Sequence, residues 1–147
     1  MFFQLVMPMN LFESHWVAVV IDFRAQIMYV LDSLDTGLAG IRKCLRPVKK
    51  ALPMILSASE YYHHKPKVEG KWKVAKVDKT LVPQQPDKYA CGPYACVAIE
   101  DIVLRRPTWT LNSARGYAKN SRDYIAEMIY NRSLDWRHDD YDLAIRS

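Results

Sequence analysis

A cysteine stands where a loop passes into a helix, within residues 83–100. Before Cys91, two prolines and two glutamines with no apolar period predict a loop. After it, apolar residues recur every three or four positions as far as Leu104, and Pro93 occupies the first turn, where a missing N–H costs nothing. Cys91 is therefore expected at the N-terminus of a helix that runs to about Arg106.

This position would make the Cys91 thiol reactive. Unpaired backbone N–H groups and the positive end of the helix dipole favour a thiolate and lower the pKa of the thiol. The same N–H groups could hold an oxyanion that forms beside the sulfur. A small buried cysteine that only packs the helix is the competing interpretation, and this stretch alone supports both equally.

Length and cysteine content limit the class of protein. A chain of 147 residues, half of them apolar, is expected to form one domain without disulfides. The three cysteines (Cys44, Cys91 and Cys96) show no CxxC or zinc-type spacing, so we expect a reducing compartment and no metal or other cofactor. Residues 1–12 lack the basic start of a signal peptide, and no stretch is long enough to span a membrane. We predict a nuclear or cytoplasmic protein.

The net charge of +5 comes mostly from residues 42–50 and 65–79. Such regions could attract an acidic partner, nucleic acid included. A solvated basic face is the more common interpretation, so nucleic acid is not the expected partner.

Four segments have strand character. Residues 2–7 predict a first strand that ends at Pro8, and residues 71–78 alternate charged with apolar side chains, as a strand with one solvated face does. Residues 16–22 and 26–31 are rich in β-branched and aromatic residues and are separated by too little chain for anything except a hairpin. The continuous apolar run in 16–22 indicates a central strand.

The hairpin predicts one contact. If its turn is centred between Phe23 and Arg24, the numbers of paired residues sum to 47, and His15 faces Asp32. Opposed residues of an antiparallel pair share a face, so an imidazole and a carboxylate would meet at the mouth of the hairpin. Alternatively, His15 is an ordinary strand-edge histidine and Asp32 a turn residue.

Two further helices are predicted. Residues 38–59 carry an apolar stripe opposite a basic one, and Pro47 and Pro53 should divide this region into two helices or kink it. Cys44 lies near the apolar side and is expected to pack there. A helix at about 121–131 should follow, and residues 133–147 should form a loosely held tail. The expected inward residues are Ile41, Leu45, Val48, Leu52 and Ile55 in the first helix and Tyr124, Ile125, Met128 and Ile129 in the second.

The motifs together resemble a known family. They are His-Trp at 15–16, Asp-Ser-Leu at 32–34, Pro-Gln-Gln-Pro at 83–86 and Tyr-Ala-Cys-Gly-Pro-Tyr-Ala-Cys at 89–96. This set resembles the catalytic domain of the ubiquitin-like-protein proteases, also called SUMO or sentrin-specific proteases, and most of all their plant-type members. The resemblance covers roughly residues 3–131. It implies an α+β, papain-like cysteine protease fold: a small mixed or antiparallel sheet flanked by helices, in one domain over 1–147.

The resemblance also implies roles for five residues. Cys91 would be the nucleophile, His15 its general base and then general acid, and Asp32 the group that orients His15. Gln85 would donate to the oxyanion, and Trp16 would cover the channel for a Gly-Gly terminus. The implied activity is a cysteine isopeptidase that cleaves after the Gly-Gly of SUMO or a related modifier through a thioester. Its partners would be that modifier and its conjugates, and we expect a monomer without membrane contact.

Two departures from the family pattern leave alternatives open. Ala90 stands where the family usually has Asp, which suggests a less rigid loop, and the helices that usually precede the histidine strand are missing. One alternative is a catalytically inactive module that binds a ubiquitin-like protein without cleaving it. Another is a nucleic-acid-associated protein that uses the basic face around Lys43 to Lys50.

Overall fold

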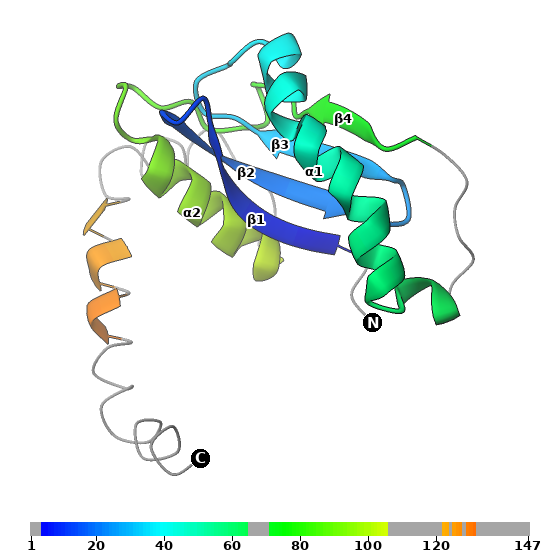
Figure 1. Cartoon of the computed structure of the whole chain (residues 1–147). Helices are drawn as coiled ribbons and strands as arrows, with labels where there is room; N and C mark the ends of the chain where they lie inside the picture. The colour runs from blue at the N-terminus through cyan, green and yellow to red at the C-terminus, as the bar shows by residue number, and fades with distance from the viewer. Residues whose placement is uncertain (1–3, 65–70, 106–121, 124, 128, 132–147) are drawn as a thin grey trace.

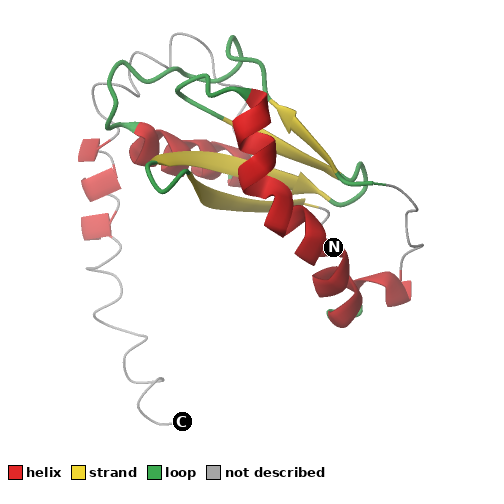
Figure 2. Cartoon of the chain, turned by 45° about the horizontal axis from the view of Figure 1, so that its top comes forward, coloured by secondary structure: helices red, strands yellow, loops and turns green. Residues whose placement is uncertain are grey.

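In the part of the chain that the structure describes, four strands form one sheet with a helix on each face. The computed structural model describes residues 4–64, 71–105, 122–123, 125–127 and 129–131. The α1 and α2 helices lie on opposite sides of the sheet (Figures 1 and 2). Neither of these helices is long and apolar enough to cross a membrane. The elements are β1 (Gln4–Leu11), β2 (His15–Asp22), β3 (Ile27–Leu31), α1 (Leu38–Ala58), the 3-10 helix η1 (Tyr61–His64), β4 (Lys73–Lys76) and α2 (Cys91–Val103).

The sheet is mixed and has the order β1-β2-β3-β4. The β1–β2 and β2–β3 pairs are antiparallel, and β4 lies parallel to β3 because the chain crosses over through α1 between them. The prediction that β2 is a central strand is confirmed, since it pairs on both edges and its apolar residues 17–21 are buried. The predicted α+β class is also confirmed.

The first strand does not end at Pro8, and that prediction is wrong. The β1 strand continues to Leu11, which pairs with His15, while Pro8 pairs with Ala18. Proline is tolerated in edge strands, and β1 is at the end of the strand order. The longer strand gives β2 a partner along its whole length and fixes His15 in the sheet.

The hairpin register is also different from the one predicted. Val19 pairs with Val30, so paired numbers sum to 49 rather than 47. The reason is the turn: the Asp22 carboxylate accepts hydrogen bonds from the backbone N–H groups of Arg24 and Ala25, both at 2.9 Å, and Gln26 adopts a left-handed conformation (φ 54°). The turn therefore holds four residues. A shift of two positions preserves the face of every side chain, unlike a shift of one.

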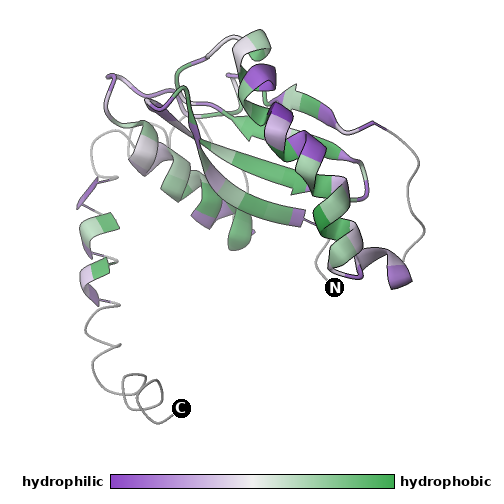
Figure 3. Cartoon of the chain, viewed as in Figure 1, coloured by the Kyte–Doolittle hydropathy of each residue, from purple (hydrophilic) through white to green (hydrophobic). Residues whose placement is uncertain are grey.

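The main core lies between the sheet and α1. The α1 helix is a single helix of 21 residues that contains Pro47 and Pro53. Of the two expected effects of these prolines, division into two helices is wrong, and a kink stays a prediction. Its buried stripe ends at Leu56, and the expected Ile55 is 59% exposed. Cys44 packs against the core as predicted. Figure 3 shows mostly hydrophobic strands, whereas hydrophilic and hydrophobic residues are mixed along α1. The fully or nearly fully buried core residues are Leu11, Val17, Val19, Ile21, Met28, Val30, Ile41, Leu45, Leu52, Leu56 and Trp72.

The second helix, α2, covers the opposite face of the sheet. Its apolar positions, including Tyr94, Val97 and Ala98, are buried as the periodicity predicts. It ends at Val103, earlier than the expected Arg106, because Arg105 takes a left-handed conformation (φ 51°). Packing of α2 on the sheet places Cys91, the first residue of α2, beside the first residues of β2.

The described part of the last predicted helix is helical at residues 122–123, 125–127 and 129–131. Ile129 is 61% exposed, so its expected inward position is wrong: none of the described elements covers it. The side chains of Tyr124 and Met128, and the predicted tail over 133–147, lie outside the described residues.

The burial pattern of α1 predicts that two substitutions in this helix differ in their effect on the free energy of unfolding. Leu45 is fully buried, whereas Met54 is 74% exposed on the same helix. We expect Leu45→Ala to lower the free energy of unfolding by about 2–5 kcal/mol, because it removes apolar contacts and leaves a cavity. Met54→Ala should change it by less than about 0.5 kcal/mol. Urea denaturation followed by circular dichroism measures both, and equal losses would show that α1 does not pack as described.

Candidate active site

A histidine and an aspartate meet in the interior at the end of the β2–β3 hairpin. His15 is the first residue of β2, and Asp32 directly follows β3. His15 Nε2 lies 2.7 Å from Asp32 Oδ1, and both side chains are buried. The pair forms although the register differs from the prediction, because the shift of two residues turns opposed positions into diagonal neighbours on the same face.

The surroundings of Asp32 keep its carboxyl group ionised. Burial alone would raise the pKa of Asp32, but the hydrogen bonds with His15 and from the backbone N–H groups of Leu34 and Thr36 outweigh it and hold the pKa well below its usual range. The Leu34 and Thr36 bonds measure 2.9 and 2.6 Å. Lys76 Nζ lies 3.7 Å from Asp32 Oδ2 and adds a positive charge. Asp32 therefore remains an acceptor.

An ionised Asp32 fixes the tautomer of His15. A carboxylate can only accept, so the proton between the two groups sits on Nε2. The other ring nitrogen, Nδ1, is buried and makes no hydrogen bond with any described residue. The hydrogen bond to Asp32 is the main cause that raises the pKa of His15; burial opposes it and the neighbouring Cys91 adds to it. Neutral His15 thus presents an unprotonated nitrogen as a base.

Cys91 is the first residue of α2 and lies close enough to His15 for their charges to interact. Burial would raise the pKa of the Cys91 thiol, but the backbone N–H of Trp16, the His15 side chain and the backbone N–H of Gly92 together lower it. The interpretation of Cys91 as a cysteine that only packs the helix does not account for these polar neighbours. His15, Asp32 and Cys91 come together from three separate segments of the chain.

Gln85 lies in the loop that precedes α2, and its side chain is buried. Its side-chain Oε1 accepts a hydrogen bond from Ser33 Oγ at 2.6 Å, and its Nε2 donates to the backbone carbonyl of Asp87 at 2.6 Å. An amide nitrogen carries two hydrogens, so one N–H of Gln85 remains for another acceptor.

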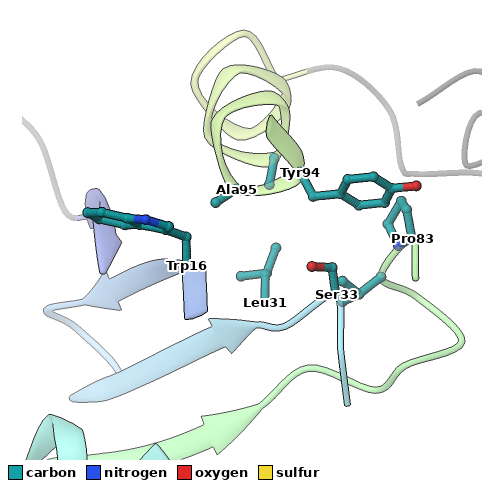
Figure 4. A pocket seen from close by; sticks show the side chains of 8 residues that line it. Trp16, Leu31, Ser33, Pro83, Tyr94 and Ala95 are labelled. Carbon is teal, nitrogen blue, oxygen red and sulfur yellow. The ribbon is translucent and has the colours of Figure 1, made fainter. Parts of the chain in front are cut away.

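Trp16 lies at the surface beside the start of α2 and is 42% exposed. A Cβ added at Gly92 would lie 3.9 Å from Trp16 Cδ1, so the indole is within ordinary contact distance of the helix. Trp16 also lines a small cavity of about 10 Å³, room for one water molecule, between β2 and α2 (Figure 4). The structure places all five predicted residues around the N-terminus of α2.

Sequence reasoning missed several polar residues that hold this site. Asp87 had a recognisable signal, because an aspartate just before a helix often accepts backbone N–H bonds. Its Oδ1 accepts from the N–H groups of Tyr89 and Ala90 at 2.7 and 2.8 Å. Lys76 binds Asp35 and the carbonyl of Thr36 and so ties β4 to the loop after β3. That contact joins positions far apart in sequence and has no local signal.

The basic residues gather elsewhere. A groove of about 470 Å³ is lined by Arg42, Arg46, Lys49, Lys50 and Val74, on the α1 side of the sheet. It contains none of the five predicted site residues. The described residues hold no group of three potential metal ligands.

A cysteine at a helix N-terminus beside a buried histidine–aspartate pair, in an α+β fold, is the arrangement of the papain-like cysteine proteases. Residues 4–135 match the Ulp1 protease family, C-terminal catalytic domain. The chain belongs to this family, and the predicted family and papain-like fold are confirmed.

Solved structures agree on the fold. Two structures of the SUMO protease Ulp1, with the catalytic cysteine oxidised to a sulfenic or a sulfonic acid, are 23% and 24% identical to the chain, with TM-scores of 0.62 and 0.63. Each match covers 90% of this chain but only 54% or 55% of the other. The C-terminal Ulp1 protease domain in complex with Smt3, the yeast ortholog of SUMO, is 22% identical over 81% of this chain and 52% of its own, with a TM-score of 0.51.

The chain thus spans about half the length of the solved structures it matches. No curated protein sequence matches it.

The His15–Asp32 pair predicts a coupled titration. Asp32→Asn removes the charge that favours imidazolium, so the pKa of His15 should fall. NMR titration of the His15 ring measures this shift. Asp78→Asn, an exposed aspartate on a different loop, is the matched control and should leave the His15 titration unchanged. An unchanged pKa in Asp32→Asn would contradict the pairing.

The Cys91 surroundings predict a thiolate at lower pH than an ordinary cysteine forms. Because the pKa of Cys91 is lowered, its alkylation by iodoacetamide should reach half-maximal rate at a lower pH than that of a free thiol. His15→Ala should move this midpoint upward, since it removes one of the stabilising groups. Measurements in a Cys44→Ser, Cys96→Ser background isolate Cys91. A midpoint that does not respond to His15→Ala would contradict the contact between the two side chains.

Proposed function

We propose that this chain is a cysteine protease domain that cleaves after the C-terminal Gly-Gly of SUMO or a related ubiquitin-like modifier. The observation that supports this most is the 2.7 Å contact between His15 Nε2 and Asp32 Oδ1, which leaves the other ring nitrogen, Nδ1, away from Asp32, while the His15 side chain also interacts with Cys91. Membership of the Ulp1 protease family supports the same chemistry. We also expect it to act as a monomer in the nucleus or cytoplasm, on the modifier and its conjugates.

Acylation follows from these roles. His15 Nδ1 takes the proton of the Cys91 thiol, and the sulfur attacks the carbonyl carbon of the terminal glycine. The negative charge that forms on the carbonyl oxygen would be held by the Cys91 backbone N–H and by Gln85 Nε2, each worth about 3 kcal/mol by analogy with other hydrolases. The tetrahedral intermediate collapses, the C–N bond breaks, and the leaving amine takes the proton from His15. A thioester remains at Cys91.

Hydrolysis repeats the steps with water. His15 Nδ1 takes a proton from water as the oxygen attacks the thioester carbon. The second tetrahedral intermediate expels the Cys91 sulfur, which recovers its proton from His15, and the modifier leaves with a free carboxylate. Asp32 stabilises the imidazolium in both halves and holds the tautomer without taking the proton.

Trp16 would supply the specificity for glycine. Its half-exposed indole lies beside Gly92 at the start of α2, next to Cys91. A channel closed by this ring admits two glycines and excludes residues with a Cβ, and the ring also keeps bulk water from the thioester.

The direct test uses a SUMO protein that carries a C-terminal electrophile. The wild-type chain should form a covalent adduct seen by mass spectrometry, and Cys91→Ala should form none. Cys96→Ala, which alters an exposed cysteine on the same helix, is the matched control and should be labelled like wild type. With a SUMO fusion substrate, His15→Ala should lower kcat by about 10³-fold or more.

Two outcomes would overturn the proposal, and a third would change only the modifier. Labelling of Cys91→Ala would place the reactive thiol elsewhere. Binding of SUMO without adduct or turnover by the wild type would identify an inactive binding module. Labelling by a ubiquitin probe in place of the SUMO probe would keep the chemistry but reject the proposed modifier.

A further inference from the structure

Hydrogen bonds link the turn after β3 to the loop before α2. Ser33 Oγ donates to Gln85 Oε1 at 2.6 Å, and the Gln85 backbone N–H donates to the Ser33 carbonyl at 2.9 Å. Beside them, Gln84 Nε2 donates to the Asp32 carbonyl at 3.2 Å. Ser33 and Gln85 are both buried, so the hydrogen bond between their side chains is shielded from water. Ser33, which directly follows Asp32, is therefore hydrogen-bonded to Gln85, the residue proposed to donate to the oxyanion.

The same network continues to Cys91. Gln85 Nε2 donates to the Asp87 carbonyl at 2.6 Å, and the Asp87 carboxylate accepts from the N–H groups of Tyr89 and Ala90, the two residues before Cys91. Where the family usually has an aspartate directly before the nucleophile, this chain has Ala90. Here the Asp87 carboxylate, three residues before Ala90, holds the loop through these hydrogen bonds.

These partners define which way the Gln85 amide points. Its oxygen faces a hydroxyl donor and its nitrogen faces a carbonyl acceptor, so a flipped amide would set its Oε1 against the Asp87 carbonyl oxygen. Leaving a buried polar group unpaired costs about 1–3 kcal/mol. With one N–H bound to Asp87 and Oε1 held by Ser33, the second N–H keeps a fixed direction.

We propose that Ser33 is a positioning residue that holds the Gln85 amide in the orientation needed to donate to the oxyanion beside Cys91. The proposal rests on the function proposed above. Because Ser33 directly follows Asp32, one turn would set both the carboxylate that orients His15 and the amide that stabilises the oxyanion. Figure 4 shows Ser33 in the wall of the small cavity, with Trp16 and Tyr94 on the other sides.

A double-mutant cycle separates positioning from a general structural role. In the wild-type background, Ser33→Ala should lower kcat for a SUMO fusion by about tenfold, less than the 10²–10³-fold expected when an oxyanion donor is removed outright, with KM changed by less than about twofold. In a Gln85→Ala background the same substitution should have less than about a twofold effect, because the amide on which Ser33 acts is gone.

Equal losses in the two backgrounds would show that Ser33 acts independently of Gln85 and would overturn the proposal. So would an unchanged kcat in the single variant. Ser57→Ala, an exposed serine in the last turn of α1, is the matched control and should match wild type. Thermal denaturation of each variant establishes that the folded fraction is the same in every assay.

A second measurement does not depend on turnover. The side-chain amide signals of Gln85, assigned by their loss in Gln85→Ala, should shift in Ser33→Ala and exchange faster with solvent, because Oε1 loses its donor. Ser57→Ala should leave them in place. If the wild-type chain has no protease activity, the proposed function fails, while these signals still decide whether Ser33 fixes the amide. Unchanged Gln85 signals in Ser33→Ala would overturn the positioning role.

Discussion

The buried hydrogen bond between His15 and Asp32 is the interaction on which the site depends. A carboxylate that is almost completely buried would normally take up a proton. Here an imidazole N–H and two backbone N–H groups, from Leu34 and Thr36, compensate for the lost water and keep Asp32 ionised. The ionised carboxylate in turn fixes the proton of His15 on Nε2. Only with that tautomer can Nδ1 act as a base toward Cys91.

The fold makes this interaction possible because it brings together the start of β2, the end of β3 and the start of α2. The β2 strand begins with His15, the chain leaves β3 at Asp32, and α2 begins with Cys91. Because α1 and α2 cover opposite faces, the sheet is held from both sides while its ends remain available for loops (Figure 1). The loops are fixed by side chains rather than by regular structure: Asp22 in the hairpin turn, and Asp87 before α2.

Much of this could be predicted from local patterns, and the errors have physical causes. Helical periodicity after Cys91 and the apolar runs on either side of Phe23 gave correct elements, because burial imposes those periods. The hairpin register was wrong by two because a side chain, Asp22, enlarged the turn. Pro8 was wrongly expected to end its strand because an edge position is not visible in the sequence. The contact of Ser33 with Gln85 spans 52 positions and exists only after folding.

The position of the proton on the neutral His15 ring tests the His15–Asp32 interaction most directly. The ¹⁵N chemical shifts of the two ring nitrogens, measured by NMR at a pH above the His15 pKa, report which nitrogen carries it. We expect a protonated Nε2, bound to Asp32, and an unprotonated Nδ1. A proton on Nδ1 would leave no base for the thiol and would show that Asp32 does not fix the tautomer of His15.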